Sequence, residues 1–287
     1  MRNLILKYIN AVVHEMRNVL PPTNTDADYA KLKQVFASLD VVESSHSSLS
    51  WASYLTRLRD HIMNDNINDF LNWEVIKKTM NFEAPYNEFM ALKADKTMMP
   101  FLSEDKVGNP KPYYAYRASS GNLIHHAYSI LQLKKLIALS EIKSIFEIGG
   151  GYGSMRRLFS RLGFSGEYSI FDFSEFLALQ QYYLSKVLDP FIQTNYISRS
   201  NQIKPSENGL LLIATWSLSE MPIALREEIL SRIQPDFVLI AYQNSFDGIN
   251  NKIYFSSFET RFSHLKFVTH KIQHLPGNYY LIGRKEH

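Results

Sequence analysis

The stretch Ser144-Ile-Phe-Glu-Ile-Gly-Gly-Gly-Tyr-Gly153 joins a short apolar run to a cluster of four glycines. An apolar run that ends in glycines, followed by a segment of helical length, predicts a strand at 144–148, a tight turn and a helix at about 153–162. Glycine permits positive φ and lets the backbone approach a ligand closely. The stretch therefore indicates either a ligand-binding loop or a strand-to-helix connection that needs glycine for its geometry alone.

Downstream of this loop, short apolar runs alternate with segments of helical length, which favours a parallel α/β sheet. Further parallel strands are expected at about 168–172, 191–196, 209–215 and 236–242. Helices are expected at about 174–187, 222–232 and 250–262. Two strand-like runs at the end, 266–272 and 278–284, are separated by the turn 273–277 and should pair antiparallel. The pattern predicts five parallel strands and a terminal hairpin.

The first third of the chain is expected to be helical, because apolar residues recur there at helical spacing, for example at Leu32, Val35, Phe36 and Leu39. Prolines then punctuate the sequence, at Pro85, Pro100, Pro110 and Pro112. A lead-in helix at about 122–139 follows. We expect a helical lid or oligomerisation region at 1–112 and a ligand-binding domain at 113–287.

Composition narrows the class of protein. The 287 residues are 45% hydrophobic and carry a formal charge of +3, with basic residues in no run longer than a pair. A nucleic-acid partner is therefore not expected, since phosphate tracking requires a dense basic stripe. The chain has no Cys, so nothing requires an oxidising compartment, and a cytoplasmic location is expected. Charged residues interrupt the apolar residues of the segment 1–20, which predicts an amphipathic helix there. No apolar run in the sequence is long enough to span a membrane.

Two acidic residues accompany the glycine loop. Glu147 precedes the first glycine by two positions, where a carboxylate can accept a hydrogen bond from an ammonium group. Asp172 ends the next strand, nineteen residues after Gly153, close to the spacing at which an acid binds a ribose diol. Asp172 could instead cap the following helix. The dinucleotide fingerprint G-x-G-x-x-G fails, because its third glycine would fall on Ser154.

These residues resemble the class I S-adenosylmethionine-dependent methyltransferases. The first motif of that family, E/D-x-G-x-G-x-G, is matched by Glu147, Gly149, Gly151 and Gly153, and its second acid by Asp172. The resemblance implies a Rossmann-like, seven-stranded sheet with an antiparallel last strand, and S-adenosylmethionine as cofactor. Residues 112–285 are similar, more narrowly, to the sugar O-methyltransferases of bacterial glycan and natural-product clusters.

The resemblance also implies contacts for each end of the cofactor. The methionine end is expected at Tyr152, Thr215 and Trp216, although Trp216 could equally be a core residue. The adenine is expected near Asn195 and Tyr196, with Phe173 available for stacking on it.

Outside these motifs, Arg117 is assigned to the cofactor-binding set, as an arginine able to clamp a carboxylate or sugar phosphate. A surface arginine is the alternative.

Methyl transfer to a hydroxyl requires a base within hydrogen-bond reach. We assign Glu220 and His274 as the catalytic candidates, although Glu220 could simply cap a helix. Further candidates near the expected strand ends and the lead-in helix are Gln243, Asn244, His270, His125 and His126. Residues 214–220 contain no Asp, so no metal site is expected and catalysis should be metal-independent.

Together these features predict an O-methyltransferase that acts on a hydroxyl of a sugar, as a nucleotide-linked or glycan precursor. A small-molecule or natural-product N- or O-methyltransferase is the alternative enzyme. A non-catalytic subunit that keeps the methyltransferase fold is the alternative of another class. The amphipathic first helix would suit a homodimer interface as well as a lid.

Overall fold

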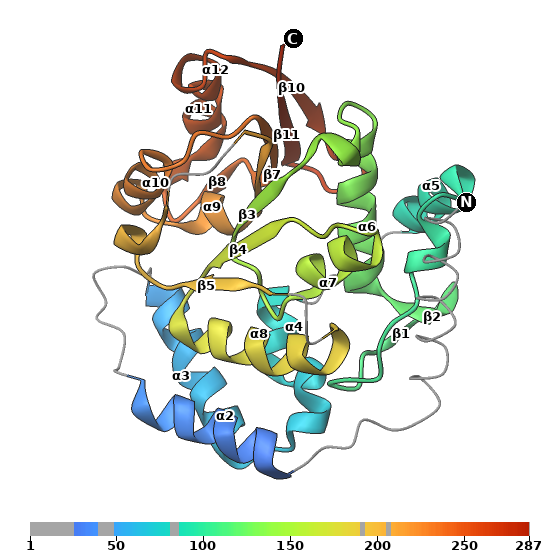
Figure 1. Cartoon of the computed structure of the whole chain (residues 1–287), viewed down its shortest axis with the longest axis vertical. Coiled ribbons are helices and arrows are strands. Elements are labelled where there is room, and N and C mark those ends of the chain that lie inside the picture. The colour runs from blue at the N-terminus through green and yellow to red at the C-terminus, as the bar shows by residue number, and fades with distance from the viewer. Residues whose placement is uncertain (1–25, 40–48, 81–85, 190–192, 205–207, 287) are drawn as a thin grey trace.

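The computed structural model describes residues 26–39, 49–80, 86–189, 193–204 and 208–286 (Figure 1). The amphipathic helix expected at 1–20 lies outside these residues. The expected strand at 191–196 lies partly outside them.

A seven-stranded sheet forms the centre of the molecule. Its strands are β3 (Ser144–Ile148), β4 (Glu167–Phe171), β5 (Asn195–Ile197), β6 (Leu210–Thr215), β7 (Phe237–Gln243), β10 (Leu265–Lys271) and β11 (Asn278–Lys285). They are ordered β10-β11-β7-β6-β3-β4-β5. Strands β5, β4, β3, β6 and β7 are parallel, and β11 is antiparallel to both β7 and β10. The predicted α/β fold, with a seven-stranded sheet and an antiparallel last strand, is confirmed.

Helices cover both faces of this sheet. One face carries α6 (Gly121–Lys134), α7 (Ser154–Arg161) and α8 (Ser174–Val187). The other carries α9 (Ser217–Glu220), α10 (Ile223–Leu230), α11 (Asn251–Ser256) and α12 (Phe258–Arg261). The alternation along β6 shows why two cores form, since Leu211 and Ile213 point into the first and Leu210 and Leu212 into the second.

Two expected elements are corrected. Strand β5 begins at Asn195, close to where the expected strand 191–196 ends, and it pairs with β4 over three residues only. The expected helix 250–262 is divided at Ser257, whose hydroxyl donates to the carbonyl of Tyr254 at 2.7 Å. Such a local bond competes with continuation of the helix.

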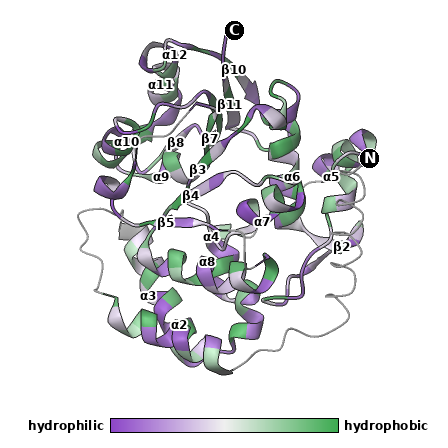
Figure 2. Ribbon diagram, viewed as in Figure 1, coloured by the Kyte–Doolittle hydropathy of each residue, from purple (hydrophilic) through white to green (hydrophobic). Residues whose placement is uncertain are grey.

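The first third contains α2 (Asp26–Ser38), α3 (Leu49–Asn64), α4 (Glu74–Met80), α5 (Tyr86–Asp95) and the 3-10 helices η2 (Ile67–Asn72) and η3 (Met99–Phe101). A small hairpin of β1 (Pro112–Tyr113) and β2 (Tyr116–Ser120) follows. Polar and apolar residues alternate along α2 and α3 (Figure 2). Their apolar faces, with Leu32 and Leu58 buried, join the same core as α8. The expected domain boundary at Pro112 stays a prediction.

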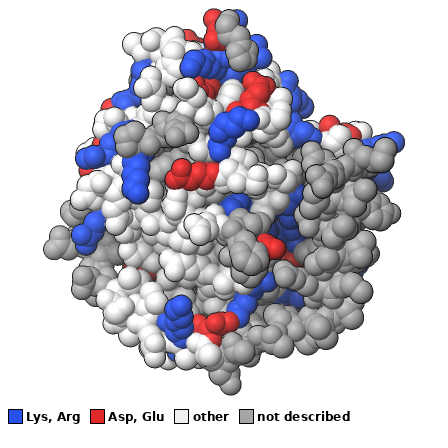
Figure 3. All heavy atoms as spheres, in the orientation of Figure 1, with Lys and Arg blue, Asp and Glu red and all other residues white. Residues whose placement is uncertain are grey.

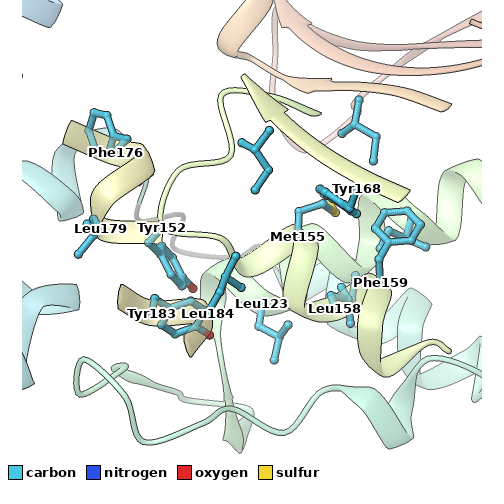
Figure 4. Close-up of a cluster of buried hydrophobic side chains, with 14 of the residues drawn as sticks. Leu123, Tyr152, Met155, Leu158, Phe159, Tyr168, Phe176, Leu179, Tyr183 and Leu184 are labelled. Atoms are coloured by element: carbon cyan, nitrogen blue, oxygen red, sulfur yellow. The ribbon is translucent and has the colours of Figure 1, made fainter. Parts of the chain in front are cut away.

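The remaining elements are the 3-10 helices η4 (Leu139–Glu141) and η5 (Ser200–Gln202) and the short hairpin of β8 (Ser245–Phe246) and β9 (Ile249–Asn250). Close to the glycine loop, Met155, Leu158 and Phe159 of α7 pack near Tyr168 of β4 (Figure 4). This packing holds the amino end of α7, and with it the loop, against the sheet.

Candidate functional site

A cavity of about 360 Å³ opens at the carboxyl edge of β3, β4 and β6. Ligands of open α/β sheets bind at this edge, and the volume falls within the range usual for small-molecule sites. The strands β3 and β6, the loops after β3, β4 and β6, and the helices α8 and α9 supply Glu147, Gly149, Gly150, Gly151, Tyr152, Asp172, Phe176, Thr215, Trp216, Ser217 and Glu220. The helices and the β10–β11 hairpin supply Trp51, Lys78, Thr79, Met80, Asn122, His125, His126, Leu275 and Asn278.

The glycine loop follows β3 and has left-handed backbone at two lining positions, with φ of +72° at Gly149 and +59° at Gly151. The amide of Gly149 donates to the carbonyl of Phe171 at 2.8 Å, which ties the loop to β4. A Cβ added at Gly149 would lie 2.3 Å from the Cβ of Ser217. Backbone conformation and crowding therefore both require glycine here, apart from any ligand.

Two buried carboxylates flank this loop. Glu147 is 2% exposed and accepts a hydrogen bond from the hydroxyl of Tyr168 at 2.7 Å. Asp172 is 8% exposed and accepts from the amide of Phe173 and from Nε2 of Gln180, both at 2.8 Å. Burial raises the pKa of each carboxyl to about 7. A ligand that donates hydrogen bonds or brings positive charge would favour the ionised forms.

Gln180 of α8 is a residue that the sequence did not single out. Its amide nitrogen donates both to Asp172 and, at 2.9 Å, to the carbonyl of Gly151. The side chain is fully buried. It joins the glycine loop to the acid at the end of β4.

Trp216, directly after β6, adopts a φ of +66°, which is rare for a bulky residue. Its amide donates to Ala241 and its indole N–H to Oδ1 of Asn278, both at 2.7 Å. These two bonds hold the strained residue in the cavity wall. Thr215 and Tyr152 also line the cavity, and the hydroxyl of Tyr152 accepts from Asn122 at 2.9 Å.

Glu220 lines the cavity at the end of α9, and burial raises its pKa to about 7. Its Oε1 lies 3.5 Å from Nε2 of Gln243. Two imidazoles, His125 and His126, face the same space from α6, and burial lowers the pKa of each to about 3. The cavity therefore contains both carboxylate and imidazole groups that can accept a proton.

His274 lies outside the cavity lining in the described part of the chain. Its Nε2 is 2.8 Å from Oε1 of Glu88, a fully buried residue of α5. The same carboxylate lies 2.9 Å from Nδ1 of His125 through each of its oxygens. His274 is therefore connected to the cavity only indirectly among the described residues, through Glu88 and then His125. From the sequence, this residue was expected in the site itself.

Five expected cofactor contacts, Tyr196 among them, are not among the described residues that line the cavity. Asn195 stands at the amino end of β5, because that strand begins where it was expected to end, and its amide donates to Glu167 at 2.7 Å. Arg117 is exposed on β2. Gly153 precedes α7 and faces Leu184. The ring of Phe173 packs 5.9 Å from that of Trp51, which does line the cavity.

The other base candidates lie at or beyond the edge of the site. His270 is exposed on β10, and Asn244 is exposed after β7. Gln243 accepts a hydrogen bond from the hydroxyl of Ser219 at 2.7 Å, and its amide nitrogen donates to Glu220 at 3.5 Å. Tyr196, which was expected near the adenine and not as a base, lines two other cavities instead.

Sequence reasoning missed the contribution of the first third, namely Trp51 of α3, Lys78, Thr79 and Met80 of α4, and Glu88 of α5. These residues belong to no motif and approach the site only through tertiary packing. The described residues hold no group of three or more His, Asp or Glu side chains that could bind a metal ion. None of the described helices has the length and apolar character needed to cross a membrane.

No known family matches the sequence, and neither does any curated protein. Among solved structures, the chain is similar to the methyltransferase domain of bacterial CtHen1, with 10% identity, a TM-score of 0.45, and coverage of 56% of this chain and 97% of that one. It is also similar to the glycopeptide N-methyltransferase MtfA complexed with S-adenosylmethionine, with 7% identity, a TM-score of 0.43, and coverage of 56% and 87%. A third similar structure is magnesium protoporphyrin IX methyltransferase from Synechocystis PCC 6803, with 12% identity and a TM-score of 0.42. The match covers 56% of this chain and 80% of that one. These likenesses are too distant to assign a reaction or substrate to this chain.

Proposed function

We propose that this protein is an S-adenosylmethionine-dependent O-methyltransferase. The observation that carries the proposal is the convergence of the glycine loop, Glu147 and Asp172 on one cavity at the carboxyl edge of the sheet. The seven-stranded order, with β11 antiparallel, is the sheet that the resemblance to class I methyltransferases implied.

The residues present fit this cofactor. The positive φ at Gly149 and Gly151 favours glycine, and because glycine has no side chain, the backbone of the loop can approach a ligand closely. Buried Glu147 suits an ammonium group, since a cation there would offset the cost of burying a carboxylate. Asp172 can accept hydrogen bonds from a ribose diol while Gln180 orients it. The cofactor, when bound, supplies an electrophilic methyl group on a sulfonium.

The chain's own residues would orient the acceptor, exclude water and remove a proton. Trp51, Met80 and Trp216 give the cavity apolar walls, and Glu220, His125 and His126 are its candidate bases. We propose that α3 and α4, whose residues Trp51 and Met80 line the cavity, act as the lid expected for residues 1–112. No step requires a metal, and we propose metal-independent transfer.

We propose a sugar hydroxyl, carried on a nucleotide or glycan precursor, as the acceptor. The narrower sequence resemblance supports this choice, and the aromatic and polar lining suits a sugar ring. Among the described residues on the face seen in Figure 3, Lys and Arg are interspersed with Asp and Glu.

Calorimetric titration of the full chain with S-adenosylhomocysteine tests the cofactor half. We expect micromolar binding that Asp172→Ala loses. Absence of binding to folded wild-type protein would overturn the proposal in favour of a non-catalytic subunit. With radiolabelled S-adenosylmethionine, a panel of nucleotide sugars should then contain a methyl acceptor, and turnover should persist with a chelator. Loss of turnover in the chelator would refute metal independence.

A further inference from the structure

Three segments far apart in the sequence meet at the carboxylate of Glu88, which is fully buried. Glu88 is on α5, His125 is on α6, and His274 is in the turn between β10 and β11. The Nδ1 atom of His125 lies 2.9 Å from both carboxylate oxygens, and Nε2 of His274 lies 2.8 Å from one of them. Of the three, His125 alone is among the described residues that line the cavity.

A carboxylate on one ring nitrogen determines the tautomer of a histidine. With Glu88 ionised, Nδ1 of His125 carries the hydrogen and donates it, and Nε2 carries the lone pair. The ring is also held by Trp216, whose centroid is 4.9 Å away at an interplanar angle of 39°. Burial lowers the pKa of His125 to about 3, so the imidazole is neutral before the reaction.

We propose that His125 is the general base of the methyl transfer and that Glu88 and His274 are positioning residues that orient it. This inference rests on the proposed function and deepens it. As the acceptor oxygen forms its bond to the methyl carbon, the hydroxyl proton passes to Nε2 of His125. The electron pair of the breaking carbon–sulfur bond remains on sulfur, which becomes a neutral thioether. The imidazolium afterwards releases its proton to solvent.

The arrangement favours His125 over Glu220 as the base. Glu88 compensates the positive charge that His125 acquires, as a carboxylate behind a catalytic histidine does. The second histidine, His274, helps Glu88 to remain ionised although burial raises the pKa of Glu88 to about 7. Glu220 accepts hydrogen bonds from the amide of Gln243, at 3.5 Å, and from Trp51, and these bonds favour its ionised form over the protonated form that a base must become.

Nitrogen-15 NMR of the full chain, labelled at its imidazoles and saturated with S-adenosylhomocysteine, tests the orientation without an acceptor. We expect His125, assigned from the signal lost in His125→Gln, to be neutral with its hydrogen on Nδ1 at about pH 8, above the pKa of Glu88. Glu88→Gln should remove this tautomer preference. The opposite tautomer, with hydrogen on Nε2 and a protonated Glu88 donating to Nδ1, would overturn the proposal.

Turnover with an acceptor from the nucleotide-sugar panel tests whether His125 is the general base. We expect His125→Gln to lower kcat by about 10²–10³-fold while the Kd for S-adenosylhomocysteine changes less than about threefold. Glu88→Gln should lower kcat with little change in KM, and Glu88→Asp should restore part of it. His264→Gln, a histidine bonded to Pro235 far from the cavity, serves as the matched control and should keep full activity.

The pH profile separates orientation from a merely structural role. The charged and titratable groups that line the cavity with His125 are Lys78, His126, Glu147, Tyr152, Asp172 and Glu220, and Glu88 and His274 lie behind it. The acidic limb of kcat should move in Glu88→Gln and stay in place in His264→Gln. Full activity of His125→Gln beside an inactive Glu220→Gln would overturn the assignment while leaving the methyltransferase proposal intact. If wild type fails to bind S-adenosylhomocysteine, the proposed function itself fails.

Discussion

The two halves of the cavity are built in different ways. The half around the glycine loop comes from one contiguous stretch, with Glu147, the loop and Asp172 at the ends of neighbouring strands β3 and β4. The opposite half is assembled from α3, α4, α6 and the β10–β11 hairpin, which are distant in sequence. The first half resembles a widely shared cofactor motif, whereas the second is particular to this chain. We therefore expect substitutions in the first half to change cofactor binding and those in the second to change turnover.

The largest effect is expected at Gly149. Alanine there would place a Cβ 2.3 Å from that of Ser217 at a φ of +72°. We expect Gly149→Ala to abolish detectable binding of S-adenosylhomocysteine and to lower the melting temperature, because either the loop or α9 must move.

Gly163→Ala is the matched control for Gly149→Ala. Gly163 has a similar φ of +89°, but nothing lies within 4 Å of an added Cβ. It should cost only the backbone strain, about 1–2 kcal/mol in the free energy of unfolding, and leave binding intact. If calorimetry showed that both variants lose affinity for S-adenosylhomocysteine equally, the loss in Gly149→Ala could not be attributed to crowding against Ser217.

The next effect concerns Asp172 and pH. Its pKa of about 7 in the ligand-free protein means that the carboxyl must lose a proton to accept the ribose hydroxyls when the pH is below 7. From Asp172 alone, affinity for S-adenosylhomocysteine should then fall by up to about tenfold per pH unit on going below pH 7, and Glu147, which has a similar pKa, adds to the fall. Asp172→Asn should weaken binding about 30-fold at pH 8, which corresponds to about 2 kcal/mol, and make the pH dependence shallower.

Asp236→Asn controls for the loss of a buried acid. Asp236 accepts hydrogen bonds from the amides of Gly209 and Leu210, remote from the carboxyl edge. Asp236→Asn should lower the free energy of unfolding. At each pH, its dissociation constant for S-adenosylhomocysteine should equal that of the wild type. A pH-independent wild-type affinity would instead remove Asp172 from the ribose site.

Gln180 should have a smaller effect, because it acts through its neighbours. Gln180→Leu removes the two hydrogen bonds that join Gly151 to Asp172. We expect affinity for S-adenosylhomocysteine to fall about fivefold to tenfold, the equivalent of about one hydrogen bond. Unchanged affinity with a lowered melting temperature would mean that the glutamine serves the core alone.

The same contrast explains what the sequence could predict. Periodicity and glycine spacing indicated the parallel strands with their terminal hairpin, the loop and its two acids, because these depend on residues close together in the chain. Glu88 could not be found in this way, since thirty-seven positions separate it from His125 and 186 from His274. Its pairing depends on how α5 packs against α6, which no local pattern encodes. His274 was selected for its place near the hairpin, and its contact with Glu88 gives it a different proposed role.

The smallest effect is expected at Asn195, where a shift in one strand changed the assignment. An edge strand that pairs over three residues has a weak sequence signal, so its start was misjudged and Asn195 was assigned to the carboxyl edge. At the amino end, its amide is engaged by Glu167. Asn195→Ala should change the affinity for S-adenosylhomocysteine by less than about twofold, well below the cost of losing a ligand hydrogen bond. Arg117→Ala, at an exposed position, should behave alike. A tenfold loss in either variant, with the fold intact by circular dichroism, would mean that the ligand extends beyond the cavity at the carboxyl edge.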